Sequence, residues 1–160
     1  METTAELRLM LDSLAEEDGV FGRVESGDAG SVDEQVYGLV LEAQTAWAPY
    51  AIEGSWEPAG PADIADALTA VDREEAETVM TYLSAGDLIS PGRLRRDREH
   101  AHRAVQRVAK LLGPDSKWWT NIELSAKGLG WNPVSRFSFD GVAVGTGNGL
   151  LVALLQVGED

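Results

Sequence analysis

Apolar residues recur at helical spacing through the first two-thirds of the chain. Leu7, Leu11 and Leu14 lie on one face of a helix that is expected to run from about residue 3 to residue 16. The same spacing predicts four more helices, over residues 31–48, 61–71, 72–86 and 94–112. The pattern therefore makes the region 1–113 predominantly helical.

Several of these helices begin or end at recognisable signals. Ser31 and Glu34 have the spacing of a capping box, in which each side chain binds the backbone N–H of the other residue. Pro61 suits the first position of the third helix, and Asp72 suits the N-cap of the fourth. Gly113, which a proline follows, ends the fifth helix.

After residue 113 the spacing changes to the alternation that is typical of strands. Four strands are expected, over Trp118–Leu124, Val134–Phe139, Val142–Val144 and Leu150–Val157. Their short connections indicate antiparallel hairpins, because a parallel crossover needs a much longer segment. Asn148-Gly149 predicts a hairpin turn, and Asp140-Gly141 predicts a second tight turn or a bulge. Within the glycine-rich loop 19–30, one alternative is a short strand at residues 20–24.

Together these elements predict an α+β fold in one domain, residues 1–160, which is helical over 1–113 and forms an antiparallel sheet over 117–158. About five helices are expected to pack on one face of a three- to four-stranded sheet. The last strand is apolar on both faces, so it should lie in the centre of the sheet or beneath a helix.

The net charge of −14 is unevenly distributed along the chain. Residues 1–90 contain 20 acidic residues and 3 arginines, whereas residues 91–117 contain 8 basic and 3 acidic residues. One interpretation is that the basic segment packs over the acidic helices and neutralises part of their field. The other is that an acidic surface recognises a basic partner. An acidic field disfavours nucleic acid, because phosphate neutralisation drives that binding.

Other features narrow the class of protein. The chain contains no cysteine, which excludes disulfides and thiolate zinc sites. No basic-then-apolar leader follows Met1, and the longest apolar run, Leu150–Leu155, is too short to cross a bilayer. A cytoplasmic protein without a membrane partner is therefore expected, and the excess of arginine over lysine is typical of a GC-rich bacterial gene. Nothing in the sequence indicates an oligomeric state.

No cofactor motif is recognisable, so no cofactor and no metal are expected. The run from Gly145 to Gly149 has the first two glycines of a dinucleotide-binding loop, but residue 150 is leucine and a strand follows instead of a helix. His100 and His102 are the only histidines, and two residues apart on a helix they point in different directions.

Carboxylates leave an enzymatic alternative open. Asp63 and Asp66 are neighbours on a predicted helix and lie near further acids, so they could bind a divalent cation or act as paired acids. The simpler explanation is chance clustering in a chain with 27 acidic residues. An enzyme with an unrecognised carboxylate site is the second alternative to a binding protein.

The segment 61–90 resembles a winged-helix DNA-binding motif. Pro-Ala-Asp-Ile-Ala-Asp-Ala-Leu, from Pro61, is similar to its first helix, and residues 73–89 are similar to a recognition helix that runs into a wing. The resemblance implies a DNA-binding regulator, with the arginines of residues 93–96 as candidate phosphate contacts. The second helix of the segment begins with acidic residues, whereas a helix in the major groove needs positive charge.

Charge and size favour a non-enzymatic, acidic protein-binding module, such as a bacterial inhibitor or immunity-type protein that blocks a basic nuclease toxin. An acidic surface captures such a target quickly by electrostatic steering, and tryptophan is a frequent anchor at interfaces. Of the adjacent Trp118 and Trp119, one should face the core and the other the outside. The predicted partner-binding residues are Glu16, Glu17, Asp18, Asp33, Glu34, Asp72, Glu74, Glu75, Trp56 and Trp119.

Overall fold

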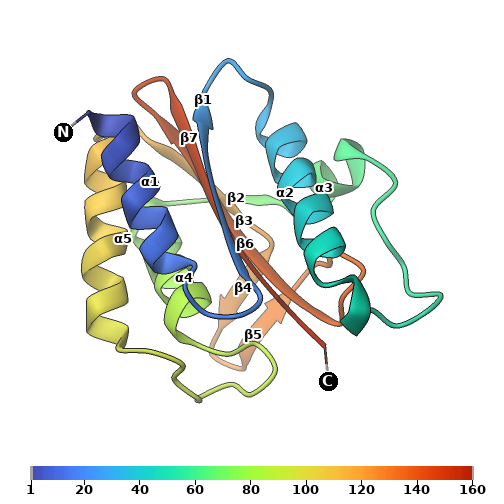
Figure 1. Ribbon diagram of the computed structural model, residues 1–160. Coiled ribbons are helices and arrows are strands. Elements are labelled where there is room, and N and C mark those ends of the chain that lie inside the picture. Colours follow the sequence, from blue (N-terminus) through green and yellow to red (C-terminus); the bar gives the residue numbers. More distant parts are fainter. Residues whose placement is uncertain (1, 160) are drawn as a thin grey trace.

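The computed structural model describes residues 2–159, which form five α-helices, one 3₁₀ turn and seven β-strands (Figure 1). The helical elements are α1 (Thr3–Leu14), α2 (Val32–Ala46), η1 (Ala48–Tyr50), α3 (Pro61–Ala67), α4 (Arg73–Ala85) and α5 (Arg98–Leu112). The strands are β1 (Val20–Ser26), β2 (Thr69–Val71), β3 (Lys117–Thr120), β4 (Ile122–Ser125), β5 (Gly128–Trp131), β6 (Phe139–Gly147) and β7 (Leu150–Gly158).

Five of the strands form one antiparallel sheet in the order β1-β7-β6-β3-β2, and β4 pairs with β5 in a separate hairpin. β7 therefore lies between β1 and β6, as its apolar pattern predicted. The α+β class and the antiparallel pairing are confirmed. The sheet has more strands than predicted, because β1 and β2 come from the helical part of the chain and are interleaved with its helices.

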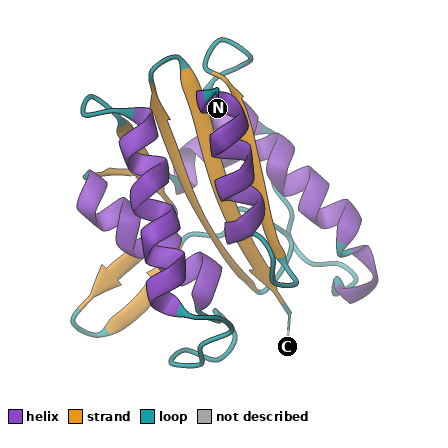
Figure 2. Ribbon diagram, turned by 60° about the vertical axis from the view of Figure 1, so that its left-hand side comes forward, coloured by secondary structure: helices purple, strands orange, loops and turns teal. Residues whose placement is uncertain are grey.

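Helices cover both faces of this sheet, so the prediction of a single covered face was wrong (Figure 2). α1, α4 and α5 pack on one face, and α2 and α3 pack on the other. The physical reason lies in β7: Val152 and Leu154 belong to the first apolar cluster, whereas Leu151 and Leu155 belong to the second. A strand that is apolar on both sides needs a helical layer on each side.

Several boundaries differ from the sequence prediction. The third helix ends at Ala67, and the residues that were expected to extend it form β2. The expected strand at 118–124 divides into β3 and β4 at Asn121, and residues 134–138 are not a strand. The alternative of a short strand after α1 is confirmed by β1, which extends to Ser26.

The predicted turn or bulge at Asp140-Gly141 was also wrong, because both residues lie inside β6, where they pair with Val157 and Gln156. The change in apolar alternation arises because β6 is buried on both faces: Phe139 packs against the first apolar cluster, whereas Val142 and Val144 belong to the second. By contrast, the hairpin turn at Asn148 and its following glycine is confirmed, with positive φ angles of 51° and 74°.

The capping box of α2 is formed as predicted. The Ser31 hydroxyl accepts from the Glu34 backbone N–H at 3.3 Å, and the Glu34 carboxylate accepts from the Ser31 backbone N–H at 3.1 Å.

Ser31→Ala should lower the free energy of unfolding by about 1 kcal/mol, because the first turn of α2 loses this acceptor. Urea denaturation of both proteins tests the value, and Ser31→Asp, which keeps a capping oxygen, should restore most of the loss.

Candidate protein-binding site

β2 is an edge strand of the sheet. This strand pairs only with β3 and forms the end of the sheet farthest from β1, and Thr69 and Ala70 are exposed. β2 is short because it lies between two helices. The first, α3, begins at Pro61 and ends at Ala67, and the second, α4, starts directly after the N-cap Asp72. Of the five residues between the two helices, Thr69–Val71 form the strand at the sheet edge, between the two helical layers.

A hollow of about 440 Å³ opens beside β2 on the α2–α3 side. Trp119 forms part of its wall, opposite Ala70 in the β2–β3 register. The adjacent Trp118 is 2 % exposed, so the prediction that one tryptophan faces the core is confirmed. Trp119 is half-buried against the second cluster. The residues around this hollow are Val32, Asp33, Ala65, Leu68, Ala70 and Trp119.

Two more hollows flank the same edge. One, of about 240 Å³, lies on the α4 side of β2, and its lining includes Val71, Glu75, Asn121 and Glu123. The other, of about 330 Å³, lies beside α3 and is lined by Trp56, Asp63, Asp66, Ala67, Asn132 and Pro133. Among the residues that line the three hollows, all within the described chain, none is basic. We define the β2-edge surface as Asp33, Trp56, Asp63, Asp66, Ala70, Glu75, Trp119 and Glu123.

This surface brings together four of the predicted binding residues, Asp33, Trp56, Glu75 and Trp119. Asp63, Asp66 and Glu123 were not among them; Asp63 and Asp66 are neighbours on α3. The sequence does not show that these acids lie close together in space. Acids at the start of α2, along α3 and at the start of α4 meet because all three helices border β2.

Other predicted binding residues have local roles. Glu34 belongs to the capping box, where hydrogen bonds from the backbone and hydroxyl of Ser31 lower its pKa. Asp72 caps α4 by accepting from the backbone N–H of Glu75 at 2.8 Å. Glu74, in the first turn of the same helix, is exposed. Negative charge at these positions is already favourable for the helix dipole, which accounts for it without a partner.

The acids that follow α1 lie elsewhere, at the turn into β1. Arg95 approaches the Glu17 carboxylate at 3.9 Å and donates to the backbone carbonyl of Asp18 at 2.5 Å. Glu16, in the same turn, is exposed. The turn therefore already has a cationic neighbour, and it does not line the hollows of the β2-edge surface.

The basic segment packs over α1, as the first interpretation of the charge pattern predicted. Arg107 forms a two-pronged ion pair with Glu6, with nitrogen–oxygen distances of 2.5 and 3.1 Å. This pair lowers the pKa of Glu6 and raises that of Arg107. Arg96 donates to the backbone carbonyl of Ser13. Two arginines from the predicted phosphate contacts, Arg95 and Arg96, are thus bound to the protein itself.

The helices of the winged-helix-like segment do not form a pair. Ile64 and Ala67 of α3 belong to the cluster on one face of the sheet, whereas Val79 and Met80 of α4 belong to the cluster on the other. In a winged helix the two helices pack against each other, and here β2 separates them (Figure 1). This geometry counts against the DNA-binding alternative.

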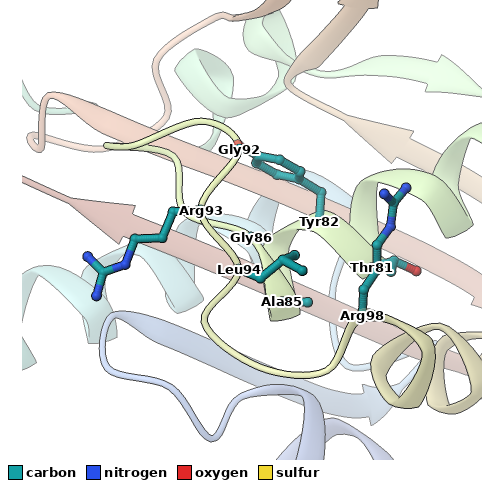
Figure 3. Close-up of a pocket in the computed structure, with 8 residues that line it drawn as sticks. All are labelled: Thr81, Tyr82, Ala85, Gly86, Gly92, Arg93, Leu94 and Arg98. Carbon is teal, nitrogen blue, oxygen red and sulfur yellow. The ribbon is translucent and has the colours of Figure 1, made fainter.

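A separate cavity of about 240 Å³ lies between α4 and the segment that connects it to α5 (Figure 3). It contains two arginines, but they do not converge: Arg93 points away from the cavity, and Arg98 stands beside Thr81 (Figure 3). Arg93 lies 3.7 Å from the Asp87 carboxylate. The cavity is smaller than typical ligand sites and shows no paired acid and base.

The most perturbed carboxyl group lies behind the β2-edge surface. Burial raises the pKa of Asp140 to about 6, although hydrogen bonds from Ser135, Val134 and Asn121 act in the opposite direction. Its oxygens accept from the Asn121 amide at 2.9 Å and from the Ser135 backbone N–H and hydroxyl at 3.0 and 2.8 Å. Asn121 also donates to the backbone carbonyl of Asn132 at 2.8 Å. Asp140 therefore holds in place two residues that line hollows of the surface.

Within residues 2–159, no three histidine, aspartate or glutamate side chains are arranged to hold a metal ion. Asp63 instead accepts from the backbone N–H of Ala59 at 2.7 Å. None of the helices between residues 2 and 159 combines the length and the apolar character that a membrane crossing requires.

Comparison with known proteins adds no family to this description. No family model, no curated protein and no solved structure matches the chain.

Proposed function

We propose that this chain is a non-enzymatic protein-binding module whose β2-edge surface captures a basic protein. The observation that carries the proposal is the placement of five carboxylates, two tryptophans and an exposed sheet edge on one surface whose lining contains no basic residue. Aromatic anchors supply contact area, and the carboxylates supply long-range attraction and selectivity for positive charge. An inhibitor of the immunity type, which blocks a basic enzyme, needs both the contact area and the attraction for positive charge.

The charge distribution supports this surface over the other acidic parts of the molecule. Elsewhere, carboxylates such as Glu6 and Glu17 lie close to arginines of the basic segment. Asp33 and Glu75 have no cation of the described chain within ion-pair distance. A basic partner therefore finds uncompensated charge at the β2-edge surface, and this charge attracts it.

Affinity capture from a bacterial lysate, at low and moderate salt, tests the proposal. The immobilised protein should retain a basic protein stoichiometrically, and its affinity should fall at least about tenfold with added salt. The triple variant Asp33→Asn, Asp66→Asn, Glu75→Gln should bind that protein about tenfold or more weakly, because it loses three charges of the surface.

A matched control removes three charges elsewhere. The variant Glu16→Gln, Asp18→Asn, Glu99→Gln has the same net charge as the test variant, and all three positions are exposed. It should keep the affinity of the original protein within about twofold to threefold. Equal weakening of both variants would show that net charge alone attracts the partner, and an empty column at both salt concentrations would contradict the proposal.

A further inference from the structure

The two edges of the sheet differ in how they are protected. β1 has charged residues of both signs along its outer groove, which is lined by Arg8, Asp12, Gly22, Arg23, Val24, Glu25 and Glu42. Arg23 is tied to α2 through the backbone and side-chain oxygens of Gln35, at 3.2 and 3.3 Å. Charged side chains on an edge strand are a common device against pairing with another chain.

β2 has no such protection. Its residues, Thr69, Ala70 and Val71, are uncharged, and the first two are exposed. Within residues 2–159, the backbone of β2 has no hydrogen-bond partner besides β3. The outward N–H and C=O groups of this strand are therefore available to an extended segment of another protein.

The hollows lie on alternate sides of this edge. Ala70 faces the α2–α3 side together with Trp119, whereas Thr69 and Val71 line the hollow on the α4 side. Side chains of a strand point alternately to the two faces of its sheet. One residue of an added strand would enter the Trp119 hollow, and its two neighbours would lie on the α4 side, near Glu75 and Glu123.

From this alternation we infer that the basic partner binds by adding an extended strand to β2, in which one apolar residue stands between two lysines or arginines. The apolar side chain fills the hollow beside Trp119, and the flanking cations face the carboxylates of Glu75 and Glu123. The inference rests on the proposed function and specifies how the partner is held. Charge complementarity decides the occupant, because the lining of both hollows is acidic without a basic residue.

The short length of β2 limits the affinity of an isolated peptide. Three residues can form only a few backbone hydrogen bonds with an added strand, so the blocked heptapeptide Ser-Thr-Lys-Leu-Lys-Thr-Ser should bind with a Kd of about 0.1 mM. In an NMR titration, the amide signals of Thr69–Val71 and Trp119 should shift. A peptide of the same composition with adjacent lysines should bind at least about fivefold more weakly.

Backbone methylation distinguishes strand addition from simple charge attraction. Only alternate N–H groups of an added strand point at the edge, so N-methylation of the leucine and of one lysine should have unequal effects. One methylated peptide should lose at least about tenfold in affinity, and the other should bind nearly as the parent does. Equal affinities of the two methylated peptides, or no shift at about 1 mM peptide, would overturn the inference.

A substitution in the chain provides the second arm. Ala70→Lys should weaken the heptapeptide and the captured basic protein at least about tenfold, because a cation then occupies the hollow. Leu9→Lys is the matched control: Leu9 is 52 % exposed on α1, far from β2 in the fold. Thermal melting should show that both variants remain folded.

The two proposals fail in different ways. If no basic protein is captured, the proposed function fails. If a basic protein is captured with equal affinity by the original protein and by Ala70→Lys, the proposed function stands and strand addition fails. Weaker capture by Ala70→Lys, together with unequal effects of the two methylated peptides, supports both.

Discussion

Asp140→Ala is expected to lower the free energy of unfolding by at least about 3 kcal/mol at pH 7. The substitution removes the acceptor for the backbone N–H groups of Val134 and Ser135 and for the side-chain amide of Asn121, all of them buried. Each buried donor without a partner costs about 1–3 kcal/mol. Urea denaturation measures the loss.

Asp115→Ala is the control for this prediction, because Asp115 is exposed and should change stability by no more than about 0.5 kcal/mol. A loss below about 1 kcal/mol in Asp140→Ala would mean that the loop before β6 does not depend on this carboxylate. A larger loss should be accompanied by weaker binding at the β2-edge surface, since Asn121 and Asn132 line its hollows.

The same residue makes stability depend on pH in a predictable direction. Burial raises the pKa of Asp140 to about 6 from a usual value of 3.8, so the folded protein holds its proton more tightly than the unfolded chain. Between pH 4 and pH 6 the folded state therefore binds more protons, and the unfolding free energy falls as the pH rises through this window, by up to about 3 kcal/mol.

The comparison with Asp140→Asn isolates this contribution. Glu6 and Glu34 have lowered pKa values and act in the opposite sense, because their contribution is lost as the pH falls below about 4.5. Their effect is common to both proteins and cancels in the difference. The stability advantage of the original protein over Asp140→Asn should be larger at pH 4 than at pH 7, and a difference that is constant with pH would contradict the assignment.

The second large effect is expected at Gly147, in β6. A Cβ atom at this position would lie 2.1 Å from the backbone carbonyl oxygen of Leu112, at the end of α5. A backbone atom cannot move aside as a flexible side chain can, so α5 must shift away from the sheet. Gly147→Ala should therefore lower the free energy of unfolding by about 2–3 kcal/mol, measured by urea denaturation.

Gly130→Ala, in the hairpin strand β5, is the matched control. No atom lies within 4 Å of the position that its Cβ would occupy, so its stability should change by less than about 0.5 kcal/mol. Equal stabilities of the two variants would show that α5 is free to move away from β6 at little cost.

The glycine run that contains Gly147 shows what local sequence can and cannot reveal. The turn at Asn148 was predictable, because it depends on the conformations of two adjacent residues. The need for glycine at 145 and 147 was not predictable, since a Cβ there would meet the Trp118 ring and the end of α5. These neighbours are close only after the sheet and the helices have packed.

The elements of the fold show the same difference between local features, which were predictable, and long-range contacts, which were not. The helix caps at Ser31 and Asp72 were evident, because a cap involves residues three positions apart. The strands β1 and β2 were harder to place, since each lies beside residues more than forty positions away. The apolar residues on both sides of β7 require a helical layer on each face, whereas the predicted architecture had a layer on one face only.

The acidic character of the candidate site was predictable from the sequence, but its location in the fold was only partly predictable. The acidic charge was evident from composition, and alternation correctly placed Trp118 and Trp119 on opposite faces of the strand, although Trp119 packs against the second apolar cluster and does not face the outside. Acids that are adjacent in the sequence favoured the turn 16–18 as a binding site, but Arg95 lies close to Glu17 there. Asp33 and Glu75 are far apart in the sequence, so nothing local grouped them. The surface that unites these two residues exists because α2 and α4 begin on opposite sides of one edge strand.

The pairing of β1 with β7 also has a consequence for how the chain folds during synthesis. Val20 lies opposite Gln156, and Ser26 lies opposite Leu150, so the first strand finds its neighbour only after more than a hundred further residues have been made. Until then the apolar faces of α1 and α2 have no sheet to cover. The core can therefore be completed only after β7 has been made, and closure of this long-range pair is expected to limit the rate of folding.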